Sequence, residues 1–108
     1  MGEADNYSVE YVRYRLKRHK SIDLVQAYEA ASEHLRAAPE CLGYELSECE
    51  EEQEIFILRI LWSSTQAHVE RFRKGPEFPP FLAIVLPFIE EIEEMRHYET
   101  TEVIWRRT

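Results

Sequence analysis

The chain has 108 residues, 44% hydrophobic and 31% charged, a composition that excludes a disordered or fibrous protein and allows one domain with one core. Lys and Arg number 13 against 21 Asp and Glu, and the net charge of -8 excludes nucleic acid and anionic membranes as expected partners, because both are bound through clustered cations. The longest mostly apolar run, residues 78–89, contains three prolines and is too short to span a membrane.

The N-terminus carries no basic segment followed by an apolar one, so we expect no secretory signal and a cytoplasmic location. We expect a flexible N-terminus over residues 1–8 and a single domain over residues 9–108.

A strand and a helix are the first predicted elements. Val12, Tyr14 and Leu16 alternate with mostly charged residues, which is the period of two expected of a strand. Ser21 is a candidate N-cap for a helix over residues 22–37, because apolar residues then recur at helical spacing until a proline interrupts them.

A β-hairpin with a charged turn follows. If residues 51–53 form its loop, Leu46 lies opposite Leu58 and Glu45 lies opposite Arg59. Opposed residues share a face of the sheet, so this register pairs apolar side chains on one face and opposite charges on the other. A shift of one residue would remove both pairings.

A brief helix is predicted after the hairpin, since Ser63 and Gln66 have the spacing of a capping box and Gly75 with Pro76 ends the pattern. A third helix is expected over residues 81–95, with a break or kink at Pro87.

The last strand is expected over residues 98–106, which are rich in β-branched and aromatic side chains. The element order βαββαβ predicts an α+β, ferredoxin-like fold with a four-stranded antiparallel sheet and the helices on one face.

The strand over residues 54–62 is apolar on both faces, and the helices cover only one of them. Leaving large aliphatic side chains in water forfeits about 1.5–3 kcal/mol each. We therefore expect a homodimer in which a second copy covers the other face. The predicted interface residues are Ile55, Ile57, Arg59 and Leu61.

Two segments resemble the antibiotic biosynthesis monooxygenase family of the dimeric α+β barrel superfamily. They are FILRILWSSTQAHVERFRKGPEF, residues 56–78, and CLGYEL, residues 41–46. The resemblance covers about residues 9–103. It implies a homodimer whose sheets form a barrel, with a substrate cavity between sheet and helices in each subunit.

The family resemblance also implies a monooxygenase that oxidises quinol-like or polyketide-like aromatic small molecules with molecular oxygen and without a cofactor. Such a site has to favour an electron-rich phenolate or carbanion, because triplet oxygen reacts slowly with closed-shell molecules. The alternative is a non-catalytic dimeric barrel that binds a small hydrophobic ligand.

Seven side chains are expected near the gap between sheet and helices. We assign catalytic roles to Trp62, an aromatic wall and N–H donor, and to His68, a proton acceptor with a pKa near the working pH. The structural alternatives are that Trp62 is only a packing residue of the core and that His68 is an exposed surface residue. The expected substrate contacts, which can equally be packing residues, are Tyr14, Tyr44, Phe72, Phe78 and Phe81.

Heme degradation and metal binding are both disfavoured. The heme-degrading branch of the superfamily uses an asparagine on the first strand and a histidine on the last helix, whereas Asn6 precedes the strand and residues 81–95 contain no histidine. The four histidines show no HxxxH or HExxH spacing, so no metal site is expected: His19, His34, His68 and His97.

Overall fold

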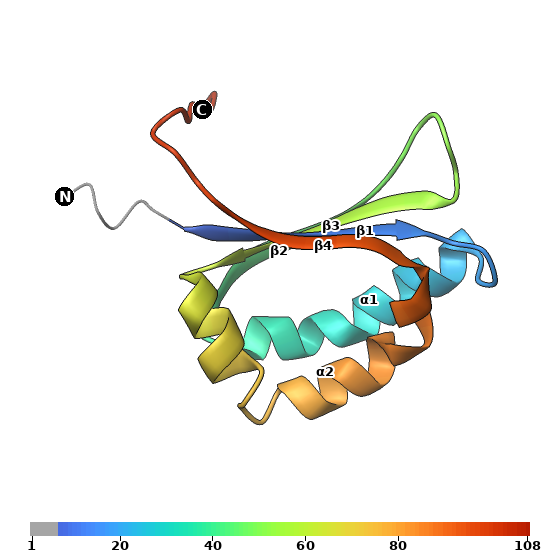
Figure 1. Ribbon diagram of the computed structural model, residues 1–108, viewed down its shortest axis with the longest axis horizontal. Helices are drawn as coiled ribbons and strands as arrows, with labels where there is room; N and C mark the ends of the chain where they lie inside the picture. The colour runs from blue at the N-terminus through green and yellow to red at the C-terminus, as the bar shows by residue number, and fades with distance from the viewer. Residues whose placement is uncertain (1–6) are drawn as a thin grey trace.

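A computed structural model describes residues 7–108 and contains a four-stranded antiparallel sheet with all its helices on one face (Figure 1). The elements are β1 (Ser8–Arg15), α1 (Ser21–Ala37), β2 (Cys41–Glu48), β3 (Ile55–Trp62), the π-helix η2 (Ala67–Phe72), α2 (Phe78–Val85), the 3-10 helix η3 (Leu86–Glu91) and β4 (Ile92–Glu99). The strand order is β2-β3-β1-β4, which confirms the ferredoxin-like α+β prediction. The N-terminal segment expected to be flexible lies outside the described residues up to position 6, and β1 already begins at Ser8.

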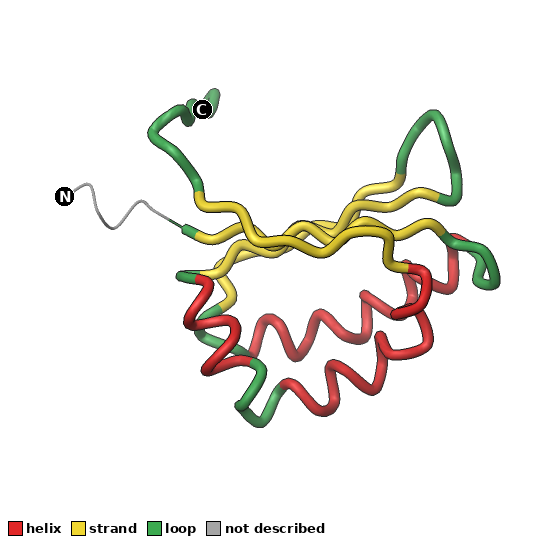
Figure 2. Tube along the Cα trace, in the orientation of Figure 1, coloured by secondary structure: helices red, strands yellow, loops and turns green. Residues whose placement is uncertain are grey.

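The core lies between the sheet and the helices that cover it (Figure 2). On β3, the inward side chains of Phe56, Leu58, Ile60 and Trp62 are each at most 2% exposed. Helix α1 begins one residue earlier than expected, because Lys20 and not Ser21 is the N-cap: the Lys20 amide donates to Asp23 Oδ2 at 2.9 Å. No helix in the described part of the chain is long and apolar enough to cross a bilayer.

The register of the β2–β3 hairpin is the predicted one. Leu46 pairs with Leu58 and Glu45 with Arg59, and Arg59 Nη1 lies 3.1 Å from Glu45 Oε2. The guanidinium also donates from Nε to the hydroxyl of Tyr11 at 3.1 Å, on the neighbouring strand. This face of the sheet, away from the helices, is called the outer face below.

The outer face is partly covered within the single chain. Ile57 and Leu61 are half-buried, but Ile55 is 2% exposed, so Ile55 is already covered within the single chain. Its partner in β1 is Arg15, whose side chain joins an ionic cluster with Glu93 on this face.

The last strand was predicted about six residues too late. Helix α2 ends at Val85 and a 3-10 turn containing Pro87 follows, so the predicted break is present and the third helix is shorter than expected. Strand β4 then pairs with β1 as far as the pair Ser8–Glu99, where β1 begins. Residues 103–105 are β-prone but exposed, since within the described residues no strand remains beside them, and β-propensity depends on such context.

Candidate active site

A cavity of about 230 Å³ lies between the sheet and the helices. Six of the seven predicted site residues line it: Tyr14, Trp62, His68, Phe72, Phe78 and Phe81. Tyr44 lies outside this lining, and its hydroxyl accepts a hydrogen bond from Arg36 Nη1 at 2.5 Å. Pockets for drug-sized ligands measure about 300–1,000 Å³, so this cavity suits a molecule of one or two rings.

The π-helix η2 positions His68. The Ala67 amide donates to Ser64 Oγ at 2.9 Å, so Ser64, and not the predicted Ser63, caps the start of this turn. The Arg73 amide then reaches the carbonyl of His68, five residues earlier, at 3.1 Å. Single π-turns of this kind occur frequently at functional sites.

Aromatic rings stack around the imidazole of His68. The rings of Trp62 and His68 are nearly parallel, at 7°, with centroids 4.2 Å apart. Phe72 packs against Trp62 with a centroid distance of 4.9 Å. The Trp62 and His68 residues are 0% and 3% exposed, so both ring orientations are fixed by packing.

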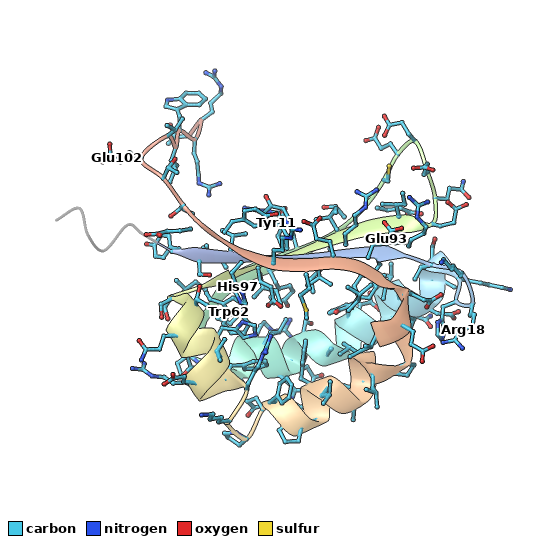
Figure 3. All side chains as sticks on the ribbon, in the orientation of Figure 1. Tyr11, Arg18, Trp62, Glu93, His97 and Glu102 are labelled. Atoms are coloured by element: carbon cyan, nitrogen blue, oxygen red, sulfur yellow. The ribbon has the colours of Figure 1, made fainter. Side chains whose placement is uncertain are left out.

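Four side chains form a continuous polar chain at this end of the cavity. Trp62 Nε1 donates to Glu10 Oε1 at 3.0 Å, and His68 Nε2 lies 3.6 Å from the same oxygen. The other nitrogen of His68, Nδ1, lies 2.7 Å from His97 Nε2, so one of the two rings donates a hydrogen bond to the other. His97 sits on β4 directly opposite Glu10 in the β1–β4 register, and Figure 3 shows it beside Trp62 on the helix side of the sheet.

Burial determines the protonation states of Glu10 and His68 in this group of side chains. Removal from water raises the pKa of Glu10, although the indole N–H and nearby positive charges act in the opposite direction. Burial also lowers the pKa of His68 to about 3, assisted by the positive charges of Arg73 and His97. At neutral pH His68 is therefore an uncharged imidazole, and its contact with Glu10 is not an ion pair.

The opposite end of the cavity holds a pair of tyrosines. The hydroxyls of Tyr14 and Tyr28 are 2.5 Å apart and their rings meet edge to face. Burial raises the pKa of Tyr14 to about 12 and holds the pKa of Tyr28 well above its usual value. Both phenols therefore remain protonated donors.

The polar chain also offers the donor types of a transition-metal site. Ligand atoms of Glu10, His68 and His97 all lie within 4.8 Å of one another, and two histidines with a carboxylate can bind Zn²⁺ or Fe²⁺. However, His68 presents one ring nitrogen to Glu10 and the other to His97. One metal ion can use only one of these nitrogens, so the arrangement fits a series of polar contacts between side chains better than a coordination sphere.

Glu10, His97 and Tyr28 were not among the residues predicted from the sequence. The alternation of β1 did carry a signal for Glu10, because it shares the inward face with Val12 and Tyr14, and a carboxylate there is unusual in a core strand. His97 was placed outside any strand because β4 was predicted too late.

The fold and the cavity define a small ferredoxin-like α+β domain with an aromatic pocket and a buried acid–base chain. The antibiotic biosynthesis monooxygenase family model matches residues 8–83, and the chain belongs to this family.

Solved structures support the fold. A Bordetella bronchiseptica protein that carries the same family name is 17% identical and has a TM-score of 0.72, with 93% of this chain and 100% of that chain covered. SnoaB, a cofactor-independent oxygenase from Streptomyces nogalater, is 13% identical, with a TM-score of 0.66 and 97% of each chain covered. A conserved protein from Methanosarcina mazei is 13% identical, with a TM-score of 0.68 and coverage of 91% and 94%. No curated protein matches the chain.

Proposed function

We propose that the protein is a cofactor-independent monooxygenase that oxidises a small quinol-like or polyketide-like aromatic molecule with O2. One observation carries the proposal: the neutral imidazole of His68 connects the buried carboxylate of Glu10 with His97 at the end of an aromatic cavity. Family membership and the structural likeness to SnoaB, itself a cofactor-independent oxygenase, support it.

Glu10, His68 and His97 would transfer the substrate proton in such a reaction. The cavity binds the aromatic ring, and Glu10 takes the proton of a substrate hydroxyl, aided by its raised pKa. His68 relays the proton toward the half-buried His97. The anion left behind can transfer an electron to O2; one oxygen atom then enters the substrate, and the other leaves as water with two hydrogens that the substrate gives up.

A non-catalytic carrier of hydrophobic ligands accounts for the cavity but not for its polar end. Burying an unpaired carboxylate is costly, and a carrier of apolar molecules gains nothing from placing Glu10 beside His68. The oxygenase proposal gives both groups a role.

Oxygen uptake tests the proposal. With a panel of hydroquinones, we expect uptake that depends on the substrate and is unchanged after EDTA treatment. Trp62→Phe keeps a ring but removes the N–H donor to Glu10, so uptake should fall about tenfold, the size expected for a hydrogen bond to a charged group. The matched control is Tyr44→Phe, which also removes one polar group from an aromatic side chain but lies outside the cavity lining, and it should leave uptake unchanged. Uptake that requires an added metal, or none with any hydroquinone, would contradict the proposal.

We also propose that the active form is a homodimer joined through the outer face. The family is typically dimeric. Ile57 and Leu61 are half-buried aliphatics on that face, around the Glu45–Arg59 ion pair. Figure 1 shows the C-terminal segment running off on the same side of the sheet, and Ile104 and Trp105 within it are 54% and 72% exposed. A second copy would cover both features.

Ile57→Glu should therefore weaken self-association at least a hundredfold, because a charge replaces an apolar group in each copy of the interface. Sedimentation velocity across a dilution series measures this directly. Leu86→Glu is the control, since Leu86 is 57% exposed on the helix side, away from the outer face. A wild-type protein that sediments as a folded single chain at every concentration would overturn the dimer.

A further inference from the structure

Two exposed segments leave the outer face of the sheet at opposite ends. Strand β1 begins beside the last residue of β4 and ends beside Ile55, which follows the turn of the β2–β3 hairpin. The C-terminal segment, residues 100–108, therefore starts at one end of the sheet, and the hairpin turn lies at the other. Figure 1 shows both segments rising on the outer side of the sheet, away from the helices.

The C-terminal segment carries apolar and basic side chains that the described part of the chain leaves exposed. Val103 and Trp105 are 91% and 72% exposed, and Arg106 and Arg107 follow them. Arg107 lies over the Trp105 ring, with its guanidinium carbon 4.6 Å from the ring centroid. Among residues 7–108, no carboxylate lies within ion-pair distance of either arginine. Exposed apolar side chains of this size indicate a surface that a partner covers.

The hairpin turn has the opposite charge. Residues 48–54, called the acidic turn below, contain five exposed glutamates: Glu48, Glu50, Glu51, Glu52 and Glu54. Among residues 7–108, only one of the five has a basic side chain within ion-pair distance, since Glu52 Oε2 lies 3.8 Å from Arg15 Nη1. Carboxylates this close together repel one another, so a cation brought to the acidic turn is bound favourably.

Two copies that pack through their outer faces with aligned strands can be arranged in two ways. If the two sheets run the same way, the two C-terminal segments meet each other and the two acidic turns meet each other, so like charges oppose at both ends. If the sheets run in opposite directions, the C-terminal segment of each copy meets the acidic turn of the other. Charge complementarity favours the second arrangement, because opposed like charges are costly.

The C-terminal segment is long enough to make this contact. Its first residue is fixed beside the start of β1, because the Thr100 amide donates to the carbonyl of Tyr7 at 3.0 Å. From Thr100 to Trp105 the chain can extend by about 17 Å. Two packed sheets lie about 10 Å apart. With the sheets opposed, the acidic turn of the second copy lies over this end of the sheet, so the segment has only to cross the interface.

We propose that residues 103–107 of one copy dock against the acidic turn of a second copy. Arg106 and Arg107 face the glutamates of that turn, and Trp105 covers Ile57 of the partner subunit, a half-buried residue near the turn on the outer face. A two-fold axis makes the same contact twice in each dimer. The inference rests on the homodimer proposed above and identifies the segments that join its two ends.

An anionic membrane or a nucleic acid is a poorer partner for the same segment. Either would approach the outer side of the sheet, where the acidic turn also projects (Figure 1). The chain as a whole carries a net charge of -8, which opposes binding to a polyanion. A second copy instead uses the acidic turn as the binding surface.

Charge reversal tests the contact, with sedimentation velocity across a dilution series as the measurement. Arg106→Glu/Arg107→Glu should weaken self-association at least about tenfold, because attraction becomes repulsion at two places in each dimer. Glu50→Arg/Glu51→Arg should weaken it to a similar extent. The protein with all four substitutions again has opposite charges in contact and keeps the original net charge. Its dissociation constant should return to within about threefold of wild type.

The matched control is Arg71→Glu/Lys74→Glu, which makes the same change in net charge on the helix side of the sheet. Both residues are exposed and neither lines the cavity. Self-association of this control should stay within about twofold of wild type. Trp105→Ser tests the apolar part of the contact and should weaken self-association about tenfold, as expected for an aromatic anchor of an interface.

Two results would overturn the inference. One is self-association of wild-type strength after reversal of Arg106 and Arg107, and the other is a protein with all four substitutions that associates as weakly as either double variant. Its failure is distinguishable from failure of the homodimer. A wild type that dimerises, and is weakened by Ile57→Glu but not by reversal of the arginines, removes only this inference. A single chain at every concentration removes the homodimer as well.

Discussion

Replacing His68 with glutamine is expected to lower the rate of substrate-dependent oxygen uptake by about 10²–10⁴-fold, the range that general acid–base catalysis contributes. The glutamine amide fits between Glu10 and His97 but cannot take a proton from one side and release it on the other. Oxygen consumption at saturating hydroquinone, with the far-UV circular dichroism spectrum as a check of folding, measures the effect.

The matched control for this variant is His34→Gln. His34 also contacts a carboxylate, with Nδ1 2.8 Å from Glu77 Oε1, but neither residue lines the cavity. Its oxygen uptake should stay within about twofold of wild type, as expected for a substitution away from the reacting groups. A folded His68→Gln protein that turns over as fast as the wild type would remove His68 from the mechanism.

The second large effect concerns stability. Burial alone would raise the pKa of Glu91, but backbone amides of Lys17 and Arg18 and the ring of His19 donate to its carboxylate, and the pKa falls to about 2. An ordinary glutamate in the unfolded chain has a pKa of 4.5. The difference stabilises the fold by about 3 kcal/mol above pH 4.5.

Glu91→Gln should therefore lower the free energy of unfolding by about 3 kcal/mol at pH 7. Because the folded pKa is the lower one, the wild type loses this contribution as the pH falls from 4.5 toward 2, and the two proteins should converge there. Urea denaturation at pH 7, 4 and 3 follows the convergence.

Glu90→Gln is the control for this experiment, since Glu90 is the neighbouring carboxylate and pairs with Arg18 at the surface, where both side chains are exposed. It should change the free energy of unfolding by less than about 0.5 kcal/mol at every pH. A Glu91→Gln deficit that is as large at pH 3 as at pH 7 would show that the carboxylate charge is not its cause.

The parts of the fold that could be predicted are those fixed by residues close together in the sequence. The Glu45–Arg59 pair fixed the hairpin register in advance, because a shift by one residue breaks both a charge pair and the apolar face. Pro87 likewise marked the end of α2. In contrast, β4 has the sequence IEEMRHYE, and its glutamates are typical of the solvent-exposed face of a helix. Only the pairing with β1 shows that this segment is a strand.

The site was predictable only in part for the same reason. Trp62 and His68 follow each other closely along one strand-to-helix segment, and the sequence alone pointed to both. Their partners Glu10 and His97 come from the two ends of the chain, and only the β1–β4 register places them opposite each other. Long-range pairing of this kind leaves no periodic signal within a short window of sequence.

The wide turn of η2 makes the position of His68 sensitive to the loss of a single residue. Because the Arg73 amide reaches back five residues, this helix contains one residue more than an α-helical turn of the same span. Losing one codon between Val69 and Arg71 would turn this wide turn into an ordinary α-helical turn, with the amide bonded four residues back instead of five, while leaving the sheet untouched. A descendant with that deletion would keep the architecture but change the turn that holds His68 between Glu10 and His97.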